Sequence, residues 1–219
     1  MATDTTIEDY LKAIWNAGEW SDAPVTVSVL AQRLSLSPSS VSELVRKLAD
    51  RSLVTHVRYG SISLTDEGRA IALATVRKHR LIETFLVEYL GYGWDEVHDE
   101  AEVLEHAVSD GFVERLASRL GEPTHDPHGD PIPAADGSLP DSPQVSLDQV
   151  VEGERVRIAR VSDDDPELLR HLVDVGVGIG AEVELVARRP AVGTVEVRLD
   201  GAPVALGLTA ASVILTEPA

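Results

Sequence analysis

A proline-rich segment in the second half of the chain limits the folds that are open to it. Residues 121–146, GEPTHDPHGDPIPAADGSLPDSPQVS, hold six of the 12 prolines in this chain of 219 residues. Proline lacks a backbone donor and restricts the residue before it, so the segment is predicted to be a linker without regular secondary structure. Only its first half, HDPHGDPIP, is expected to be held against the protein surface. The chain is therefore predicted to form separate domains on either side of this linker.

The chain before the linker is predicted to begin with three helices and a hairpin. Apolar residues recur at helical spacing within residues 6–20 and again within 27–36. Ser37 followed by Pro38 is typical of the N-cap and first position of a helix. The next helix gathers its apolar side chains on one face, namely Val41, Leu44, Val45 and Leu48. LVTHVRYG and SISLTDEG then alternate as two strands, which are predicted to meet in a two-residue turn at Gly60–Ser61.

This order of elements predicts a winged helix-turn-helix domain that binds DNA. The net charge of −18 opposes nucleic acid, but residues 25–60 hold five basic and two acidic residues, a local charge of +3. Three unrelated amphipathic helices beside a hairpin are the alternative interpretation. Small side chains allow close approach to base edges, whereas basic ones reach phosphates. The predicted DNA contacts are Ser37, Ser39, Ser40 and Ser42 near the start of the recognition helix, and Arg46, Lys47 and Arg58 on phosphates.

Two further helical stretches precede the linker, and short strands follow it. Helical patterns run from Asp66 to about Leu90 and from about Asp95 to His106, and SDGFVERLASRLG continues in helix to Gly121. Their broad apolar faces predict a dimerisation layer. After the linker, GERVRIARVS, AEVELVAR, TVEVRLDG and VALGL alternate as strands, with a helical DPELLRHLVDVG among them. This pattern predicts a small β-barrel of roughly 70 residues, in which GVGIG forms a turn.

The acidic stretch HDEAEVLEHAVSD, residues 98–110, offers metal ligands at one-turn spacing. His98, Glu102 and His106 follow one another on a helix face beside Glu105, and an earlier helix carries His79 and Glu83 at i, i+4. So many acids on one helix repel each other unless a cation lies among them. An ordinary solvated helix face is the alternative interpretation. The chain has no cysteine, which excludes disulfides and thiolate ligands.

These motifs together resemble the metal-dependent repressors typified by the diphtheria toxin repressor and the manganese transport regulators. EDYLKAIW, SPSSVSELVRKL, RKHRLIETFL, WDEVHDEAEVLEHAVSD and DPHGDPIP are similar to successive motifs of that family, and the last 70 residues resemble its SH3-like third domain. The resemblance implies a mainly α fold with small β parts. Its domains would be a winged helix-turn-helix over 1–73, a helical dimerisation and metal-binding domain with the start of the linker over 74–141, and an SH3-like (FeoA-type) domain over 142–219.

The resemblance also implies two metal sites. The primary site would use Asp9, Glu102, Glu105 and His106. The ancillary site would use His79, Glu83 and His98, with Asp165 from the third domain. The family's second ligand in that domain falls on Leu168, which cannot coordinate a metal, and Asp164 and Glu167 are the alternatives.

The resemblance implies a metal-activated repressor, and the ligand types favour manganese. Iron-type members carry Met and Cys where this chain has Asp9 and Glu102, and oxygen ligands suit Mn²⁺. We expect a homodimer that binds double-stranded operator DNA, as one or two dimers per operator; Fe²⁺ or another divalent transition metal is the alternative cofactor. Lys12 replaces a first-helix acid of the short manganese regulators, so a second ion beside Asp9 is not expected.

Two other classes of function compete with a repressor. A hydrolytic metalloenzyme would use similar ligands, but the chain has no H-E-x-x-H and no nucleophile motif, so no enzyme is expected. A metal-storage protein would leave the helix-turn-helix unexplained. The N-terminus has neither the basic nor the apolar region of a secretory signal, and no apolar run approaches the roughly 18 residues that span a bilayer. A cytoplasmic protein without a membrane partner is expected.

Overall fold

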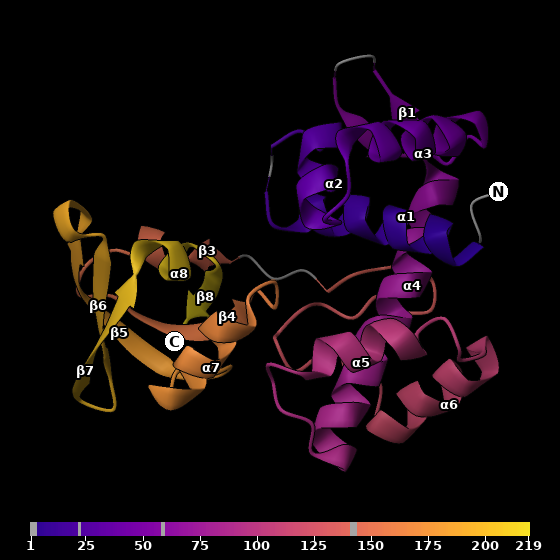
Figure 1. Cartoon of the computed structure of the whole chain (residues 1–219). Helices are drawn as coiled ribbons and strands as arrows, with labels where there is room; N and C mark the ends of the chain where they lie inside the picture. The colour runs from indigo at the N-terminus through magenta and orange to yellow at the C-terminus, as the bar shows by residue number, and fades with distance from the viewer. Residues whose placement is uncertain (1–3, 22, 58–59, 141–143) are drawn as a thin grey trace. The chain divides into compact units, whose positions relative to one another are not determined.

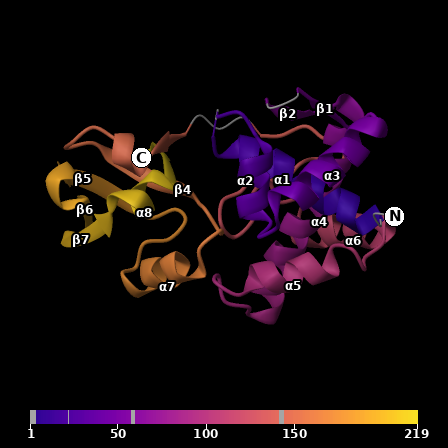
Figure 2. The ribbon, with the colours of Figure 1, turned by 45° about the horizontal axis from the view of Figure 1, so that its top comes forward.

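A computed structural model describes residues 4–21, 23–57, 60–140 and 144–219. The chain forms two compact units, one of Met1–His79 with Pro133–Ser138 and one of Arg80–Ile132 with Leu139–Ala219. Figure 1 and Figure 2 show the ribbon of both units. Within the described ranges, no helix is both long and apolar enough to cross a membrane.

The first unit is a winged helix-turn-helix, as the sequence predicts. Its elements are α1 (Asp4–Glu19), α2 (Val27–Arg33), α3 (Pro38–Asp50), β1 (Val54–His56), β2 (Ile62–Leu64) and the larger part of α4 (Asp66–Phe85). The apolar faces of these helices meet in one core. The predicted stripe of α3 is buried in full, because Val41, Leu44, Val45 and Leu48 are at most 7% exposed.

Local hydrogen bonds set where these helices begin. Ser37 caps α3, since its side chain accepts from Ser40 N. Before α4, the Thr65 hydroxyl donates to Leu53 O at 3.1 Å. A Cβ on Gly68 would lie 2.0 Å from Leu53 O, so only glycine allows α4 to start this close to the preceding loop.

The wing differs from its predicted form. β1 and β2 pair antiparallel from Val54↔Leu64 to His56↔Ile62, and beyond them Val57 N donates to Ser61 O at 3.3 Å. The prediction of a two-residue turn at Gly60–Ser61 is therefore wrong, because this register places Ser61 opposite Val57 and not at the centre of a turn. Arg58 lies outside the described residues.

The helical part of the second unit packs around its own core. It contains the end of α4, a π-helical turn η1 (Leu86–Leu90), α5 (Val97–Leu104) and α6 (Asp110–Leu120). The predicted helix ending at His106 is two residues too long, because α5 ends at Leu104. A separate helix follows, since Ser109 caps α6 by accepting from Phe112 N. The core includes Leu81, Leu86, Val97, Ala101, Val113 and Leu116.

The proline-rich segment has no helix or extended strand over residues 121–140, in agreement with its sequence. Within this segment, His125 and Pro131 nevertheless form an isolated antiparallel β-bridge. Asp126 N donates to Asp130 O at 3.0 Å, and Ile132 N donates to Thr124 O at 2.9 Å. Residues 124–132 are called the ligand loop below.

The remaining residues form a six-stranded antiparallel sheet in the order β3-β8-β4-β5-β6-β7. Its core gathers the inward-facing residues of the strands with Leu169 and Leu172 of α7. The predicted helix and the predicted turn at 176–180 are both present. The elements are β3 (Val145–Ser146), η2 (Leu147–Gln149), β4 (Arg155–Val161), α7 (Pro166–Asp174), β5 (Glu182–Arg189), η3 (Pro190–Val192), β6 (Thr194–Leu199), β7 (Ala202–Gly207), α8 (Leu208–Ser212) and β8 (Ile214–Pro218).

Candidate metal centre

Helix α4 carries two ligand-type side chains one turn apart. His79 is 5% exposed and Glu83 is 1% exposed, and residues i and i+4 share one helix face. A carboxylate buried this deeply requires a compensating positive charge or hydrogen bonds. The surroundings of Glu83 therefore decide what this face can bind.

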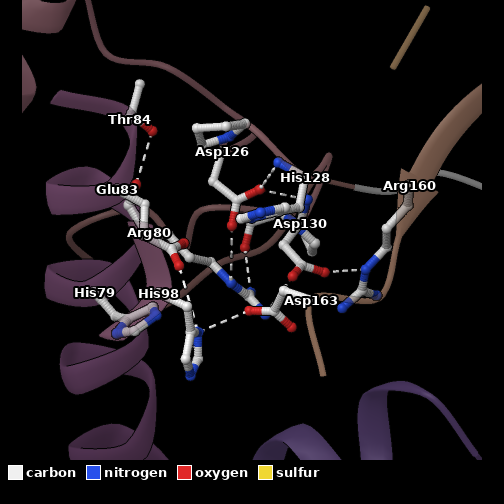
Figure 3. Close-up of polar contacts among 12 residues, drawn as sticks. His79, Arg80, Glu83, Thr84, His98, Asp126, His128, Asp130, Arg160 and Asp163 are labelled. Atoms are coloured by element: carbon white, nitrogen blue, oxygen red, sulfur yellow. Dashed lines mark hydrogen bonds and ion pairs between the residues drawn. The ribbon is translucent and has the colours of Figure 1, made fainter. Parts of the chain in front are cut away.

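His98 of α5 lies between carboxylates from separate parts of the second unit. Its Nδ1 is 2.9 Å from Asp163 Oδ2 and 3.5 Å from Glu83 Oε1. Its Nε2 is 3.5 Å from Glu102 Oε1 on the same helix. Figure 3 shows Glu83 and Asp163 both directed at the imidazole of His98.

These contacts keep the His98 imidazole charged in the metal-free protein. Burial alone would lower the pKa of His98, but hydrogen bonds to Asp163 and Glu83 raise its pKa to about 11. Burial would likewise raise the pKa of Asp163, but the hydrogen bond to His98 lowers that pKa to about 2. A proton thus supplies the positive charge that the two acids require.

His128 of the ligand loop is buried, and one of its ring nitrogens, Nδ1, has no hydrogen-bond partner among the described residues. The side chain is 0% exposed, and its Nε2 is 2.8 Å from Trp94 O. Because a carbonyl only accepts, Nε2 carries a proton, and in the neutral imidazole Nδ1 presents a lone pair. The Trp94 ring stacks on the imidazole at 5.5 Å between centroids and 10° between planes.

Asp126 lies beside that lone pair. Its Oδ1 accepts from His128 N at 2.8 Å and from Asp130 N at 2.9 Å. Burial, together with repulsion from Asp130 and Glu83, raises the pKa of Asp126 well above its ordinary value. A carboxylate in such surroundings favours any bound cation, whether a proton or a metal ion.

Glu83 belongs to two groups of donor atoms within the second unit. One donor atom from each of Glu83, Asp126 and His128 lies within 4.8 Å of the others, and the same holds for Glu83, His98 and Asp163. These donors are carboxylate oxygens and imidazole nitrogens, without sulfur. Such a set fits a divalent transition metal ion, and the unpartnered lone pair of His128 is the observation that points to one.

The formal charges agree with this fit. Two buried guanidiniums, Arg80 and Arg160, face the acids of the cluster (Figure 3). With neutral histidines, and with the partly exposed Glu102 left out, two positive groups against four carboxylates leave a formal charge of −2, which a divalent cation balances. The four carboxylates are those of Glu83, Asp126, Asp130 and Asp163.

The other predicted ligands occupy two places. Glu105 caps the end of α5 and is 1% exposed, and His106 Nε2 is 3.4 Å from Glu105 Oε1. Asp9 lies on α1 in the first unit. In that unit Lys12 Nζ is 3.5 Å from His79 Nδ1, so a buried lysine lies beside a predicted ligand.

Sequence reasoning missed three ligand-type residues, Asp126, His128 and Asp163. Asp165, which it selected instead, accepts from Glu167 N at 2.9 Å and Leu168 N at 3.2 Å as the N-cap of α7. The run SDDDPE contains several acids whose order the sequence alone does not rank. The motif DPHGD carried a usable signal, because two acids and a histidine lie between prolines that hold the loop in shape.

The predicted DNA-binding residues that the structure describes lie on the exposed face of α3. Ser37 Oγ lies 2.9 Å from both Ser39 Oγ and Ser40 Oγ. Lys47 Nζ is 2.8 Å from Glu43 Oε1, which lowers the pKa of Glu43 through a hydrogen bond. Ser42 and Arg46 are exposed on the same face.

Comparisons with known protein families cover almost the whole chain. Residues 2–62 match the iron dependent repressor N-terminal DNA binding domain, and residues 65–134 match the iron dependent repressor metal binding and dimerisation domain. Residues 145–218 match the FeoA domain.

Curated relatives and solved structures agree with these matches. The diphtheria toxin repressor of Corynebacterium efficiens is 38% identical over 84% of this chain and 83% of its own length. The iron-dependent repressor IdeR of Mycobacterium leprae is 35% identical over 82% of this chain and 83% of its own. A manganese-dependent transcriptional repressor solved in complex with manganese is 49% identical, with a TM-score of 0.93 over 97% of this chain and 100% of that one. The manganese regulator SloR is 37% identical, with a TM-score of 0.83 over 97% and 98%.

The DNA-binding domain, the metal-binding and dimerisation domain and the FeoA domain therefore occur in one chain and in the order of these relatives. Their function is transcriptional repression rather than catalysis. The chain belongs to the diphtheria toxin repressor family of metal-dependent transcriptional repressors.

Proposed function

We propose that this repressor responds to manganese and binds operator DNA as a homodimer when its metal sites are filled. The observation that carries the proposal is the donor set around Glu83, buried at Glu83, Asp126 and His128 and partly buried at His98 and Asp163, which consists of oxygen and imidazole donors. Such donors suit Mn²⁺, whereas softer thiolate and thioether ligands favour other ions. The 49% identity to a repressor in complex with manganese supports the same choice.

The proposed ancillary ligands extend the set that the resemblance implies. To His79, Glu83 and His98 we add Asp126 and His128 of the ligand loop and Asp163 in place of Asp165. Asp163 contacts His98 directly, while Asp165 already accepts two backbone hydrogen bonds. A bound divalent cation would supply the positive charge that the His98 proton supplies without it.

The proposed primary ligands are Asp9, Glu102, Glu105 and His106, as the resemblance implies. The burial of Glu105 and its contact with His106 support a cation at the end of α5. Because Asp9 belongs to the DNA-binding domain, joint coordination would restrict how that domain moves against the dimerisation domain. In a two-fold dimer this favours two recognition helices spaced for successive major grooves, roughly 34 Å apart.

A second candidate function is an iron-responsive repressor. The curated relatives include iron-dependent repressors at about a third identity. Raw affinity of divalent ions rises from Mn²⁺ to Fe²⁺, so donor type alone does not exclude iron. Of Mn²⁺ and Fe²⁺, the carboxylates of Asp9 and Glu102 favour Mn²⁺.

The test begins with DNA selected by the protein from a random pool in the presence of Mn²⁺. Fluorescence anisotropy of the selected DNA is then measured against buffered free Mn²⁺, Fe²⁺ under anaerobic conditions, and Zn²⁺. We expect Mn²⁺ to activate binding within the range of free metal that cells maintain, and the metal-free protein to bind weakly. Activation by Fe²⁺ alone would favour the iron-responsive alternative, and selection of no sequence with any metal would refute the repressor.

Ligand variants complete this experiment. Glu83→Gln and Asp163→Asn should each weaken Mn²⁺ binding by at least about tenfold, because loss of a ligand exceeds the usual effect of removing an outer-shell partner. Asp165→Asn is the matched control, since asparagine caps a helix as well as aspartate. Loss of Mn²⁺ binding in Asp165→Asn but not in Asp163→Asn would reverse the assignment.

A further inference from the structure

Strand β4 carries a buried arginine that neither proposed metal site uses. Arg160 is 5% exposed, and its Nε pairs with Asp130 Oδ1 of the ligand loop. Figure 3 shows this pair at the side of the cluster away from His98. Arg160 belongs to the FeoA domain, and Asp130 belongs to the loop that bears Asp126 and His128.

The backbone of β4 also contacts the ligand loop at the residues before and after Arg160. Before it, the pairing of β4 with β8 shifts register between Ile158 and Arg160, as at a β-bulge. A Cβ on Gly129 would lie 2.0 Å from Ala159 O, so the loop approaches the strand as closely as glycine permits. After it, Val161 N donates to His128 O at 2.9 Å.

Asp130 connects Arg160 to the proposed ligands Asp126 and His128. Its backbone N–H donates to Asp126 Oδ1, the oxygen that also accepts from His128 N. Arg80 lies on the other side, 3.9 Å from Asp130 Oδ2 and 3.8 Å from Asp126 Oδ2. Asp130 therefore helps to hold the Asp126 carboxylate and, through it, the backbone of His128, whose imidazole is oriented by Trp94.

We propose that Arg160 is a positioning residue, through which the FeoA domain sets the metal affinity of the Glu83 site. This inference depends on the proposed metal site. Without the guanidinium, Asp130 would keep a buried carboxylate that has lost its closest partner, and a loop in that state rearranges towards solvent. The donor atoms of Asp126 and His128 would then no longer lie close to Glu83.

A purely electrostatic role for Arg160 predicts the opposite result. A guanidinium close to the site repels a divalent cation, so its removal would tighten metal binding if position did not matter. The sign of the change in Mn²⁺ affinity thus separates positioning from charge. Global stability does not enter this comparison, because affinity is measured on the folded chain.

The experiment measures Mn²⁺ binding to the full chain by the electron paramagnetic resonance signal of the free ion. Its variants are Arg160→Gln, Asp130→Asn, the double variant, and Arg157→Gln as matched control. Arg157 lies on the same strand but is exposed, where it pairs with Glu182 and Glu217. Glu83→Gln identifies the fraction of Mn²⁺ that belongs to the site. Circular dichroism verifies the fold of each variant.

We expect Arg160→Gln to weaken the Glu83-dependent Mn²⁺ binding by about tenfold or more, the usual effect of losing an outer-shell partner. Arg157→Gln should change it by less than twofold. The double variant should recover part of the loss, because an asparagine at position 130 does not need the guanidinium that Arg160→Gln removes, and it answers the question if Arg160→Gln does not fold. Unchanged or tighter binding in the Arg160 variants would overturn the inference. Absence of any Glu83-dependent Mn²⁺ in the wild type would instead refute the proposed metal site.

Discussion

At the scale of single residues, the two histidines of the cluster meet buried acids in different ways. His98 is held as a cation by Glu83 and Asp163, and its raised pKa follows from those contacts. His128 donates a hydrogen bond from Nε2 to Trp94 O, and among the described residues its Nδ1 has no hydrogen-bond partner. At the proposed site, metal binding would therefore release a proton from His98 and would use the lone pair of His128 Nδ1.

The state of His98 predicts how the stability of the metal-free protein depends on pH. A folded pKa raised from 6.5 to about 11 gives stability that is full below pH 6.5 and is lost as pH rises towards 11. The lowered pKa of Asp163 gives stability that is full above its ordinary 3.8 and is lost as pH falls towards about 2. The ion pair therefore stabilises most between about pH 4 and 6.5. The His98 side chain is 39% exposed, so water weakens its contribution.

Urea unfolding with a chelator present tests this dependence. Wild type should exceed His98→Gln in free energy of unfolding by more at pH 5.5 than at pH 9. A difference that stays constant between these two pH values would contradict the charged state assigned to His98.

At the scale of elements, caps and close approaches position the functional faces. The Ser37 cap starts the recognition helix where its serines and basic residues are exposed, and β4 fixes the ligand loop through Gly129. The wing and α5 show the limits of periodicity. Alternation continued beyond the end of β1, and the helical pattern continued beyond Leu104, because both patterns describe burial rather than backbone hydrogen bonds.

The helix-capping role of Ser37 and its proposed DNA contact can be separated by substitution. Ser37→Asp keeps a good N-cap, so the free energy of unfolding should stay within about 0.5 kcal/mol of wild type. The added negative charge faces the DNA phosphates, so operator affinity should fall by about tenfold. Ser109→Asp makes the same change at the N-cap of α6 and serves as control. Unaltered operator affinity in Ser37→Asp would remove Ser37 from the DNA interface.

At the scale of the whole molecule, the net charge of −18 works against DNA binding. The local charge of +3 over residues 25–60 offers attraction only if that segment faces the DNA and the acidic remainder does not. A dimer that holds two such segments at the spacing of successive major grooves meets this condition. Metal dependence is then a matter of how often the competent dimer is populated.

Loss of a primary ligand should separate dimerisation from DNA binding. Asp9→Ala and Glu102→Ala are expected to abolish Mn²⁺-dependent operator binding while the protein remains a folded dimer, since neither residue belongs to a hydrophobic core. Gel shifts measure the first property, and sedimentation measures the second. Metal-dependent gel shifts that persist in either variant would refute the proposed primary site.

The sequence by itself determined the winged helix-turn-helix, the helical middle and the β-rich third domain, because apolar periodicity and caps such as Ser37 act within a few residues. It also located Glu83 and His98, which helix spacing and the family resemblance both mark. Only the tertiary structure decided that Asp126, His128 and Asp163 join them, and that Asp165 caps a helix. The contacts that bring the loop into place span long intervals, as between His128 and Trp94 at 34 residues and between Asp130 and Arg160 at 30. No local pattern encodes such distances, because they arise only when separate elements pack together.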